Sequence, residues 1–379
     1  MNRAPPDAID SANVRRSAPL RVEIANDWPE GWARCAAAAE ARSLFLGPTW
    51  IETFSRHFAD ARLRILASFE RGAAEPAYLL PLFVEAGEAS AFANYYVSAV
   101  GMVGPDDPRT MCRHARALVD ALAQWRPRLT GVRLQPLLYE GHDYRALHAA
   151  FRAAGWIVEE FFGCGNWRLD TAGARYDDYF AGLPGALRST ITRKRKKLLK
   201  AGGDVEIHRT PADVSAHLAA YEAVYRQSWK VREDREDFVR DMALAFAREG
   251  AMRLGAVRLD DRIIASQIWI VRNGTASIYK LAYDEDYSAL SAGTVLSDAM
   301  FRTAFDEDGV HTVDYLTGDD AYKRDWMRER REFWGLYAHN PATARGAVRG
   351  LRTMAKRVIR VLRAGTPGRR GTSPRPDPG

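Results

Sequence analysis

The amino-acid sequence predicts a mixed α/β fold built from two halves of similar design. The chain has 379 residues, of which 47% are hydrophobic, so it is longer than one core comfortably holds and has the usual length of two domains. Alternating apolar patterns typical of strands are interspersed with the 3.6-residue periodicity of amphipathic helices. The same order of strands and helices occurs twice along the chain. We therefore expect two copies of one α/β arrangement in tandem.

The first predicted domain covers residues 20–162. A strand pattern opens it, two helical patterns and three strands follow, and two helix–strand pairs complete it. In chain order the segments are LRVEIA, WPEGWARCAAAAEAR, PTWIETFSRHF, RLRILASFE, AYLLPLFVEA, SAFANYYVS, TMCRHARALVDALAQW, GVRLQPL, a helix at 141–154 and WIVEEFF. The predicted order is β-αα-βββ-α-β-α-β.

The second predicted domain covers residues 163–341 and repeats this order after a helix, GALRSTITRKRKKLLKAG. Its remaining segments are a strand at 204–210, helices at 212–229 and 234–249, the strands AMRLGAVRL, RIIASQIWIV and ASIYKLAYD, a helix at 293–305, and then HTVDYLT, DAYKRDWMRER and FWGLYAH. The pair Asn273-Gly274 is a strong signal for a tight turn between two strands.

Charge and cysteine usage exclude several classes of protein. The net charge is +7, but residues 342–379 hold ten Lys or Arg and one acid, so this tail carries +9 and the remainder −2. A basic tail does not indicate that the folded part binds nucleic acid. The three cysteines are far apart and the histidines are scattered. We therefore expect no disulfide, no metal site and a cytoplasmic location.

The two ends of the chain differ from the body in composition. Residues 1–19 lack the apolar segment of a signal peptide and are expected to form a disordered leader. Residues 342–363 have the pattern of a basic amphipathic helix, whose apolar stripe is Val348, Leu351, Ala355, Val358, Ile359 and Leu362. Such a helix can lie on an anionic surface, here the inner face of the membrane. The alternative is a helix docked on the body, followed by a disordered end.

The order of elements is that of the GCN5-related N-acetyltransferase (GNAT) fold, a mixed sheet that is splayed near its middle. The segments RSTITRKRKKLLKAG, YKLAYDEDYSALSAGTVL and VDYLTGDDAYKRDWMRERREFWGL, with FLGPTWIETFSRHF and YLLPLF near the start, resemble the CelD/BcsL-type acetyltransferases. These are a branch of the acyl-CoA N-acyltransferase superfamily and are similar to the Fem-type peptidyl transferases. The resemblance covers most of residues 20–340. It implies tandem acetyltransferase-like domains, the second of which binds acetyl-CoA or a longer acyl-CoA.

A phosphate-binding site is predicted at Ala292, Gly293, Thr294 and Val295. A helix N-terminus offers unpaired N–H groups and a partial positive charge, and a glycine there lets phosphate approach the backbone. The resemblance implies that this turn receives the pyrophosphate of coenzyme A, although a single glycine stands where the family usually has a richer loop. The alternative is an ordinary helix start capped by Ser291.

Catalytic and substrate-binding residues are predicted on the strands around this helix. In SIYKLAYD, alternation places Tyr279, Leu281 and Tyr283 on one face and Lys280 on the other. A lysine among buried neighbours needs an anionic partner, so Lys280 and Tyr283 are candidates for contacts with substrate. The alternative for Lys280 is an exposed strand position.

The segment DYLTGDDAYKRDW supplies the predicted catalytic residues. Amine acylation needs a base for the ammonium and an acid for the departing thiolate. Asp314 could orient or deprotonate the amine. The resemblance implies that Tyr322 protonates the thiolate and that Lys323 steadies negative charge at the reacting centre. The alternatives are a turn residue for Asp314 and a core face for Tyr322 and Trp326, which is itself a candidate for substrate binding.

The basic run RKRKKLLK reads as the solvated face of a helix. The resemblance implies that Arg188 or Arg193 contacts a carboxylate or phosphate of a substrate. Interleaved aromatic residues that would stack on RNA bases are missing from this run.

These residues predict a cytoplasmic N-acyltransferase that moves an acyl group, acetyl foremost, from acyl-CoA to an amine of a sugar, amino acid or lipid precursor. The acceptor is expected between the domains, in a pathway such as envelope polysaccharide biosynthesis. Direct attack of the amine on the thioester is expected, because the sequence has no nucleophile elbow. The alternatives are a Fem-like transferase that uses aminoacyl-tRNA and a non-catalytic protein of polysaccharide assembly.

Overall fold

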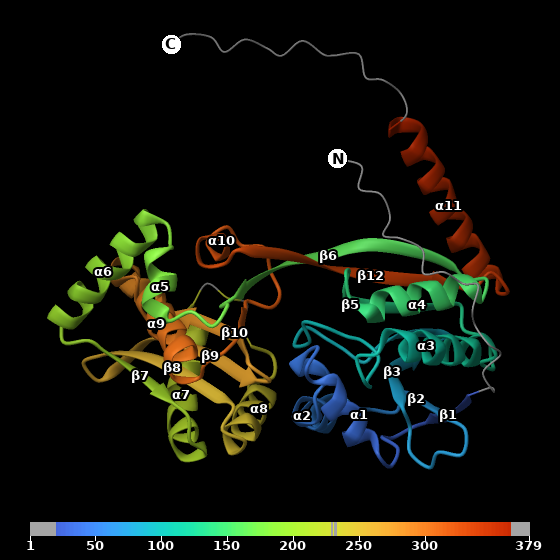
Figure 1. Cartoon of the computed structure of the whole chain (residues 1–379), viewed down its shortest axis with the longest axis horizontal. Helices are drawn as coiled ribbons and strands as arrows, with labels where there is room; N and C mark the ends of the chain where they lie inside the picture. Colours follow the sequence, from blue (N-terminus) through green and yellow to red (C-terminus); the bar gives the residue numbers. More distant parts are fainter. Residues whose placement is uncertain (1–19, 229, 231–232, 365–379) are drawn as a thin grey trace, which may run out of the picture.

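The computed structural model describes residues 20–228, 230 and 233–364, and these form one mixed sheet with helices on both faces (Figure 1). The sheet has twelve strands within this described part, in the order β1-β2-β3-β4-β5-β12-β6-β11-β10-β9-β8-β7. The predicted leader, residues 1–19, and the last residues of the predicted tail, 365–379, lie outside the described residues.

The first half supplies six strands and four α-helices in the predicted order. They are β1 (Arg21–Ala25), α1 (Trp32–Ala39), the short η2 (Leu44–Leu46), α2 (Pro48–Phe58), β2 (Leu63–Phe69), β3 (Tyr78–Glu85), β4 (Glu88–Ala91), α3 (Pro108–Ala123), β5 (Gly131–Leu138), α4 (His142–Ala153) and β6 (Ile157–Asp170).

The second half begins with two helices and then repeats that order. Its elements are α5 (Tyr176–Ala181), α6 (Gly185–Lys200), β7 (Asp204–His208), α7 (Pro211–Gln227), α8 (Glu236–Arg248), β8 (Met252–Leu259), β9 (Arg262–Arg272), β10 (Thr275–Tyr283), η3 (Glu285–Leu290), α9 (Ala292–Arg302), η4 (Thr303–Glu307), β11 (Thr312–Asp314), α10 (Lys323–Trp326), β12 (Glu329–His339) and the final α11 (Ala344–Ala364).

The predicted mixed α/β fold is confirmed, with differences in several elements: α5 was not predicted, β6 runs eight residues past its predicted end, and β4, β11 and α10 are shorter than predicted. The predicted strand SAFANYYVS is reduced to β4, and the chain then continues as a loop. The predicted helix DAYKRDWMRER is a single turn, α10, because the chain is extended from Met327 and pairs with β6 from Glu329 onward. Pairing with a neighbouring strand thus overrides the helical propensity of this charged run.

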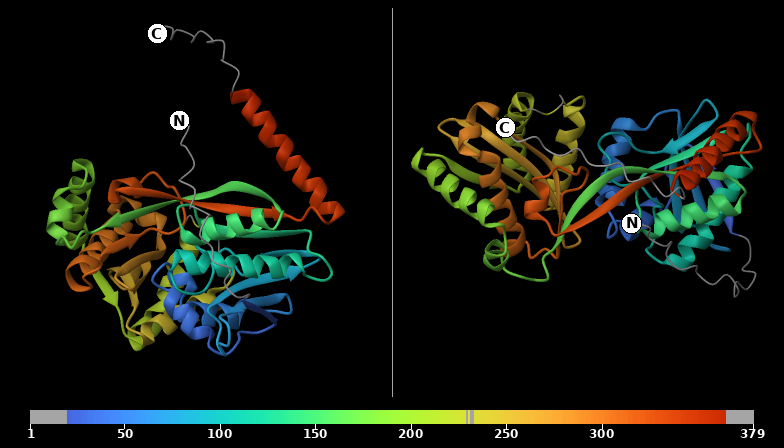
Figure 2. Two further views of the ribbon diagram at one scale, coloured as in Figure 1. Left: turned by 45° about the vertical axis from the view of Figure 1, so that its right-hand side comes forward. Right: turned by 90° about the horizontal axis from the view of Figure 1, so that it is seen from above.

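The two halves exchange strands at the centre of the sheet. β12, the last strand, lies between β5 and β6 and pairs antiparallel with both. The end of β6, residues 168–170, pairs in turn with β11 of the second half. Figure 2 shows β6 and β12 as one long ribbon that crosses from half to half. The boundary expected between residues 162 and 163 therefore falls inside β6, and β12 completes the sheet of the first half.

Each half contains one parallel strand pair at the same place in its order. β4 pairs with β5 over three residues, and β10 pairs with β11 over three, from Thr275–Ser277 to Thr312–Asp314. All other neighbouring strands are antiparallel. Each short parallel pair marks the place where a half-sheet splays open.

The helices that face each other across the two halves share a hydrophobic core. Side chains of α1 and α2 from the first half and of α7 and α8 from the second lie in one buried cluster. Trp50 of α2 contacts Phe238 of α8, with ring centroids 5.7 Å apart, and Tyr279 of β10 at 5.5 Å. Each half also has a core of its own on the opposite face of the sheet. The halves are therefore held together by packing as well as by the exchanged strands.

Candidate active site

The candidate site lies where β10 and β11 part. β11 ends at Asp314, whereas β10 continues to Tyr283, so the two strands are hydrogen-bonded only at one end. A cavity of about 530 Å³ opens beyond this point, on the side of the sheet covered by α9. We call it the α9 cavity. The predicted residues that line it are Tyr283, Gly293, Thr294, Tyr322 and Trp326.

The first turn of α9 faces the α9 cavity with free backbone donors. Thr294 and Val295 give their N–H groups to the carbonyl of Ser291, at 3.0 and 3.1 Å. The N–H groups of Ala292 and Gly293 precede the first helical hydrogen bond, and no acceptor for them lies among the described residues. The side chains of Ala292 and Val295 are buried in the core. Of the four predicted residues, Gly293 therefore both lines the cavity and has a free N–H group.

Ser291 does not act as the side-chain cap that the alternative interpretation required. Its backbone is left-handed, with φ 51°, and its hydroxyl makes no capping hydrogen bond to the helix. A left-handed conformation is unusual for a residue other than glycine. It turns the chain sharply from η3 into α9. The start of α9 is thus left without a competing side chain, as an anion-binding turn requires.

Gly293 lies directly against an aromatic side chain of the preceding strand. A Cβ atom at this position would stand 3.3 Å from the ring of Tyr283. Any larger side chain would have to displace that ring or extend into the cavity. The glycine is therefore required for close packing as well as for access to the backbone.

Gln267, which was not predicted, anchors the first turn of α9. Its Nε2 donates to the carbonyl of Gly293 at 3.2 Å and to the hydroxyl of Ser297 at 2.9 Å, and its Oε1 accepts from Trp269 at 2.8 Å. A buried glutamine within the apolar strand RIIASQIWIV was the sequence signal for this role, because a buried amide needs partners. Tyr315 and Asp320, also not predicted, line the same cavity.

Tyr322 and Trp326 also line the α9 cavity. Tyr322 directly precedes α10, and Trp326 is the last residue of that helix. Tyr322 is 43% exposed, and burial of its ring, followed by the nearby charge of Asp320, raises the pKa of its hydroxyl. The hydroxyl therefore stays protonated at neutral pH and can donate. Trp326 is buried and stacks on Phe301, with ring centroids 4.9 Å apart. It combines a core role with its place in the cavity wall.

Lys323 is buried behind Tyr322. Its ammonium donates to the carbonyl of Thr317 at 2.9 Å and lies 3.1 Å from Asp320. It also lies against Gly318, which has φ 115° and where a Cβ atom would come within 2.7 Å of Nζ. The lysine thus stabilises the turn that follows β11. Its ion-pair partner Asp320 is one of the residues that line the α9 cavity, whereas Lys323 itself is not.

Lys280 faces away from the α9 cavity, as its alternation with the lining residues Leu281 and Tyr283 predicts, but β10 also contains a bulge. The pairing register with β9 shifts between Ile278 and Lys280. Tyr279 and Lys280 therefore share a face, contrary to the alternation expected from sequence. The Lys280 ammonium donates to Glu233 at 2.7 Å, and burial lowers its pKa. The required anionic partner is a carboxylate of the protein.

Asp314 lies on the opposite face of the sheet from Tyr315, in a second hollow of about 290 Å³. We call this the inter-half cleft, because residues of both halves line it, from Glu40 to Phe333. The Asp314 carboxylate accepts from Asn166 at 2.6 Å, Arg331 at 2.8 Å and the backbone N–H of Leu316 at 2.7 Å. It is therefore held rigidly between β6, β11 and β12, apart from Tyr322 and Lys323.

Arg188 and Arg193 are exposed on α6, beside the site rather than in it. Leu187 of this helix lines the α9 cavity. Lys194 donates to the carbonyl of Ala289 at 2.7 Å and fastens α6 to the loop before α9. The basic face of α6 therefore borders the cavity mouth.

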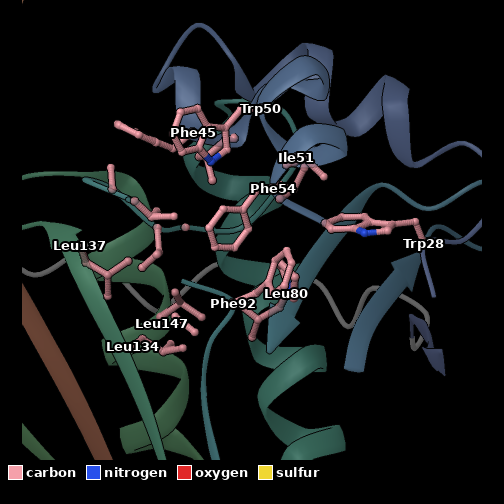
Figure 3. A pocket seen from close by; sticks show the side chains of 18 residues that line it. Trp28, Phe45, Trp50, Ile51, Phe54, Leu80, Phe92, Leu134, Leu137 and Leu147 are labelled. Atoms are coloured by element: carbon pink, nitrogen blue, oxygen red, sulfur yellow. The ribbon is translucent and has the colours of Figure 1, made fainter. Parts of the chain in front are cut away.

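A pocket of the first half, lined by residues of α2, β3, β5 and α4 but by none of α3, is nearly filled by aromatic side chains. Figure 3 shows Phe45, Trp50, Phe54 and Phe92 directed into a space that retains only about 30 Å³. Helix α3, which corresponds to α9 in the order of elements, is capped by Asp107, whose carboxylate accepts from the N–H groups of the first turn. A carboxylate in this position occupies the donors and repels phosphate. Within the described residues, the geometry suited to a phosphate therefore occurs at α9.

One group of side chains has the composition of a metal site. Glu206, His208 and His217 bring potential ligand atoms within 4.8 Å of one another. However, Arg258 binds Glu206 through two hydrogen bonds, at 2.6 and 2.9 Å. The group is thus already a charge-paired cluster between the outer strand β7 and helix α7, and the expected absence of a metal stays a prediction.

A mixed sheet whose strands part beside a helix start, with a cavity between them, is the arrangement of a GNAT-type domain. Residues 185–324 match the family described as "Acetyltransferase (GNAT) domain". The match contains the start of α9, the parted strands and Lys323. A search of curated protein sequences finds no match.

Solved structures of similar fold cover both halves. The crystal structure of FemX has a TM-score of 0.59 at 11% identity, over 83% of this chain and 96% of that one. The C-terminal domain of a putative lysylphosphatidylglycerol synthetase from Agrobacterium fabrum has a TM-score of 0.51 at 12% identity, over 86% and 96%. A conserved protein of unknown function from Bacteroides thetaiotaomicron has 0.52 at 11%, over 81% and 97%. At these identities the likeness shows the fold alone.

Proposed function

We propose that the protein is an N-acyltransferase that moves an acyl group, acetyl foremost, from acyl-CoA to an amine acceptor. One observation carries the proposal. The α9 cavity is lined by Gly293, in the first turn of α9, and by Tyr322, at the splay between β10 and β11. Pyrophosphate is suited to the first of these places, and the departing thiolate to the second.

The mechanism we infer is direct transfer. The acceptor enters as the free amine, and its nitrogen attacks the thioester carbonyl. The C–S bond breaks as the C–N bond forms, Tyr322 donates a proton to the departing sulfur, and the proton that the nitrogen loses restores the Tyr322 hydroxyl. The support for Tyr322 is its place on the cavity wall. Lys323, paired with Asp320 and hydrogen-bonded to the carbonyl of Thr317, stabilises the turn behind this tyrosine.

The acceptor is proposed to bind in the inter-half cleft, on the other face of β10 and β11. Asp314 lines this cleft, one residue before Tyr315 of the α9 cavity. Because its carboxylate already accepts three hydrogen bonds, we assign it the orientation of the acceptor amine rather than its deprotonation. The acceptor class remains an amine of a sugar, amino acid or lipid precursor. A CelD/BcsL-type role in envelope polysaccharide biosynthesis belongs to the same proposal.

A second candidate donor is aminoacyl-tRNA, as in a Fem-like transferase. It is favoured by the exposed basic face of α6 at the cavity mouth, which includes Arg188 and Arg193. The same α9 cavity would then hold the aminoacyl end. A protein of polysaccharide assembly that binds acyl-CoA without turnover is the third reading.

A thermal-shift panel with acetyl-CoA, longer acyl-CoAs and aminoacyl-tRNA separates these functions. The wild-type protein should be stabilised by an acyl-CoA. Gly293→Asp should lose this stabilisation, because its carboxylate would stand where phosphate approaches. Gly293→Ala is the matched control, since it adds only the Cβ atom near Tyr283. A rise in melting temperature with aminoacyl-tRNA alone would favour the second candidate. Equal rises with acyl-CoA in Gly293→Asp and wild type would contradict a phosphate site at the start of α9.

A further inference from the structure

Helix α11 is held on the body by a face of small residues. Gly346 packs on the backbone of Asn340 and Thr130, and Gly350 packs on Ile157 of β6, so that a Cβ atom at either glycine would collide. Thr353, on the same face, is 4% exposed and donates to Glu159 at 3.0 Å. The close approach fixes which side of the helix faces the protein.

Basic side chains lock this orientation. Arg349 pairs with Glu88 and also donates to the hydroxyl of Tyr337. Arg357 donates to the carbonyl of Val158 at 2.7 Å. The orientation of α11 is therefore set by the protein itself, and its opposite side is presented outward in a defined way.

The outward side is apolar. Val348 is 50% exposed, Leu351 63% and Met354 50%. These are three of the nine large hydrophobic residues that are exposed in the described part of the chain. In the sequence, Val358, Ile359 and Leu362 continue the same helical spacing. Figures 1 and 2 show α11 rising away from the rest of the fold, so the body does not cover this stripe.

We propose that the outward stripe of α11 rests on an anionic lipid bilayer. Between Ala344 and Ala364 the sequence has seven Arg or Lys and no acid. Arg345 and Lys356, next to the stripe, keep side chains that are 60% and 71% exposed. An apolar stripe bordered by basic side chains is typical of a helix that lies in a membrane interface. No helix of the described residues is long and apolar enough to cross a membrane, so the contact is peripheral.

The charge pattern favours lipid over a second copy of the chain. Two copies that buried this stripe against each other would bring two strongly basic helices together, and their like charges would repel. A bilayer with anionic headgroups neutralises the same charges and receives the apolar side chains. The proposal is independent of the acyl donor, and it would place the acceptor cleft near lipid-linked substrates.

Vesicle co-sedimentation of the full-length protein tests the proposal. Vesicles of phosphatidylcholine with a quarter phosphatidylglycerol should sediment the protein, whereas pure phosphatidylcholine should do so at least about tenfold less. Val348→Gln with Leu351→Gln should reduce sedimentation by at least about tenfold, because these side chains are the ones inserted. High salt should weaken binding of the wild type without abolishing it.

The matched control is Ile24→Gln with Leu199→Gln. These two side chains are exposed to a similar degree, 47% and 57%, but lie on β1 and α6. This control should sediment like the wild type. The proposal is overturned if the wild type stays in the supernatant, if the α11 variant binds as well as the control, or if light scattering shows a dimer that only the α11 variant loses.

Discussion

The position of Tyr322 is the reason to assign it proton donation. Its side chain lines the α9 cavity, and its hydroxyl is protonated at neutral pH, although burial raises its pKa above the ordinary value of a tyrosine and so weakens it as an acid. Its ring contacts that of Tyr315 edge-on, with centroids 6.0 Å apart. Removal of the hydroxyl alone would leave this contact in place.

The first prediction concerns this hydroxyl. Tyr322→Phe should lower kcat by about 10²–10⁴-fold, the usual contribution of a general acid, and should leave the KM for acyl-CoA and the melting temperature nearly unchanged. Steady-state kinetics and a thermal melt measure these quantities. Tyr139→Phe is the matched control, because Tyr139 is similarly exposed but lies outside the cavity. A kcat within a factor of two of wild type would assign proton donation to another group.

At the scale of residues, the sequence indicated which polar residues are buried or functional better than it indicated which neighbours their side chains contact. Gly293 was recognisable because a glycine at the start of an apolar helix lets a ligand approach the backbone N–H groups. Tyr279 was assigned to the face opposite Lys280, because a bulge that changes which residues share a face leaves no mark in the apolar pattern. Asp314 was recognised as polar at the end of a strand, but its partner Arg331 comes from β12.

At the scale of elements, the position of α9 depends on β9. Gln267 reaches from β9 to the carbonyl of Gly293 and to Ser297, and so fixes the first turn of the helix on the sheet. The two N–H groups offered to phosphate belong to this turn. Their direction is therefore set by Gln267, to which we assign no part in the reaction itself.

The second prediction tests this anchor. Gln267→Leu should destabilise the fold by about 1–3 kcal/mol, since Trp269 Nε1 and Ser297 lose a buried partner. Affinity for acyl-CoA should fall several-fold, because the first turn of α9 is no longer fixed. Gln267→Glu, which keeps the acceptor for Trp269, should recover part of the stability. Calorimetric titration of each variant with coenzyme A provides the test, and unchanged affinity in Gln267→Leu would contradict a positioning role.

The order of elements could be read from the sequence, whereas several of their lengths could not. Helical and strand periodicities differ strongly, so each predicted segment was found in the predicted order. β4 and α10 are shorter than predicted because their neighbours decide where they end. The parallel pairing of β4 with β5 ends at Ser90. The charged run after α10 is extended and pairs with β6 as part of β12.

At the scale of the whole molecule, β12 is the strand on which the centre of the sheet depends. It pairs with β5 and β6 together, and its Leu336 and Ala338 are fully buried. Without it, both neighbours would expose unpaired backbone and apolar side chains. The helix that follows, α11, covers only the end of this ribbon.

The third prediction compares two truncations. A chain that ends at Arg328 should show no cooperative thermal transition, because β5 and β6 lose their shared partner. A chain that ends at Thr343 keeps β12 and loses α11, and should melt within about 5 °C of the full chain. Circular dichroism and size-exclusion chromatography report both results. A cooperative melt of the shorter chain near that of the longer one would show that the exchanged strand is dispensable.

The exchange of strands could not be predicted from the sequence. WIVEEFF and FWGLYAH each read correctly as a strand, but strand periodicity says only which side chains share a face. It does not say which half of the molecule a strand will join. The contact between Trp50 and Phe238 in the shared core could not be predicted for the same reason, because the apolar face of a helix does not indicate which element it will pack against.

Because β12 is inserted between β5 and β6, the order of synthesis determines when the sheet of the first half can be completed. The ribosome makes the first half early, but that half waits for its central strand until residues 329–339 have emerged, about 190 residues after the end of β5. At usual translation speeds this interval is roughly 10–40 s. During it, β5 has an open edge that any other strand could join. The nascent chain is therefore most exposed to mispairing and to chaperone binding after its first half appears finished, and a pause in translation before residue 329 would lengthen that interval.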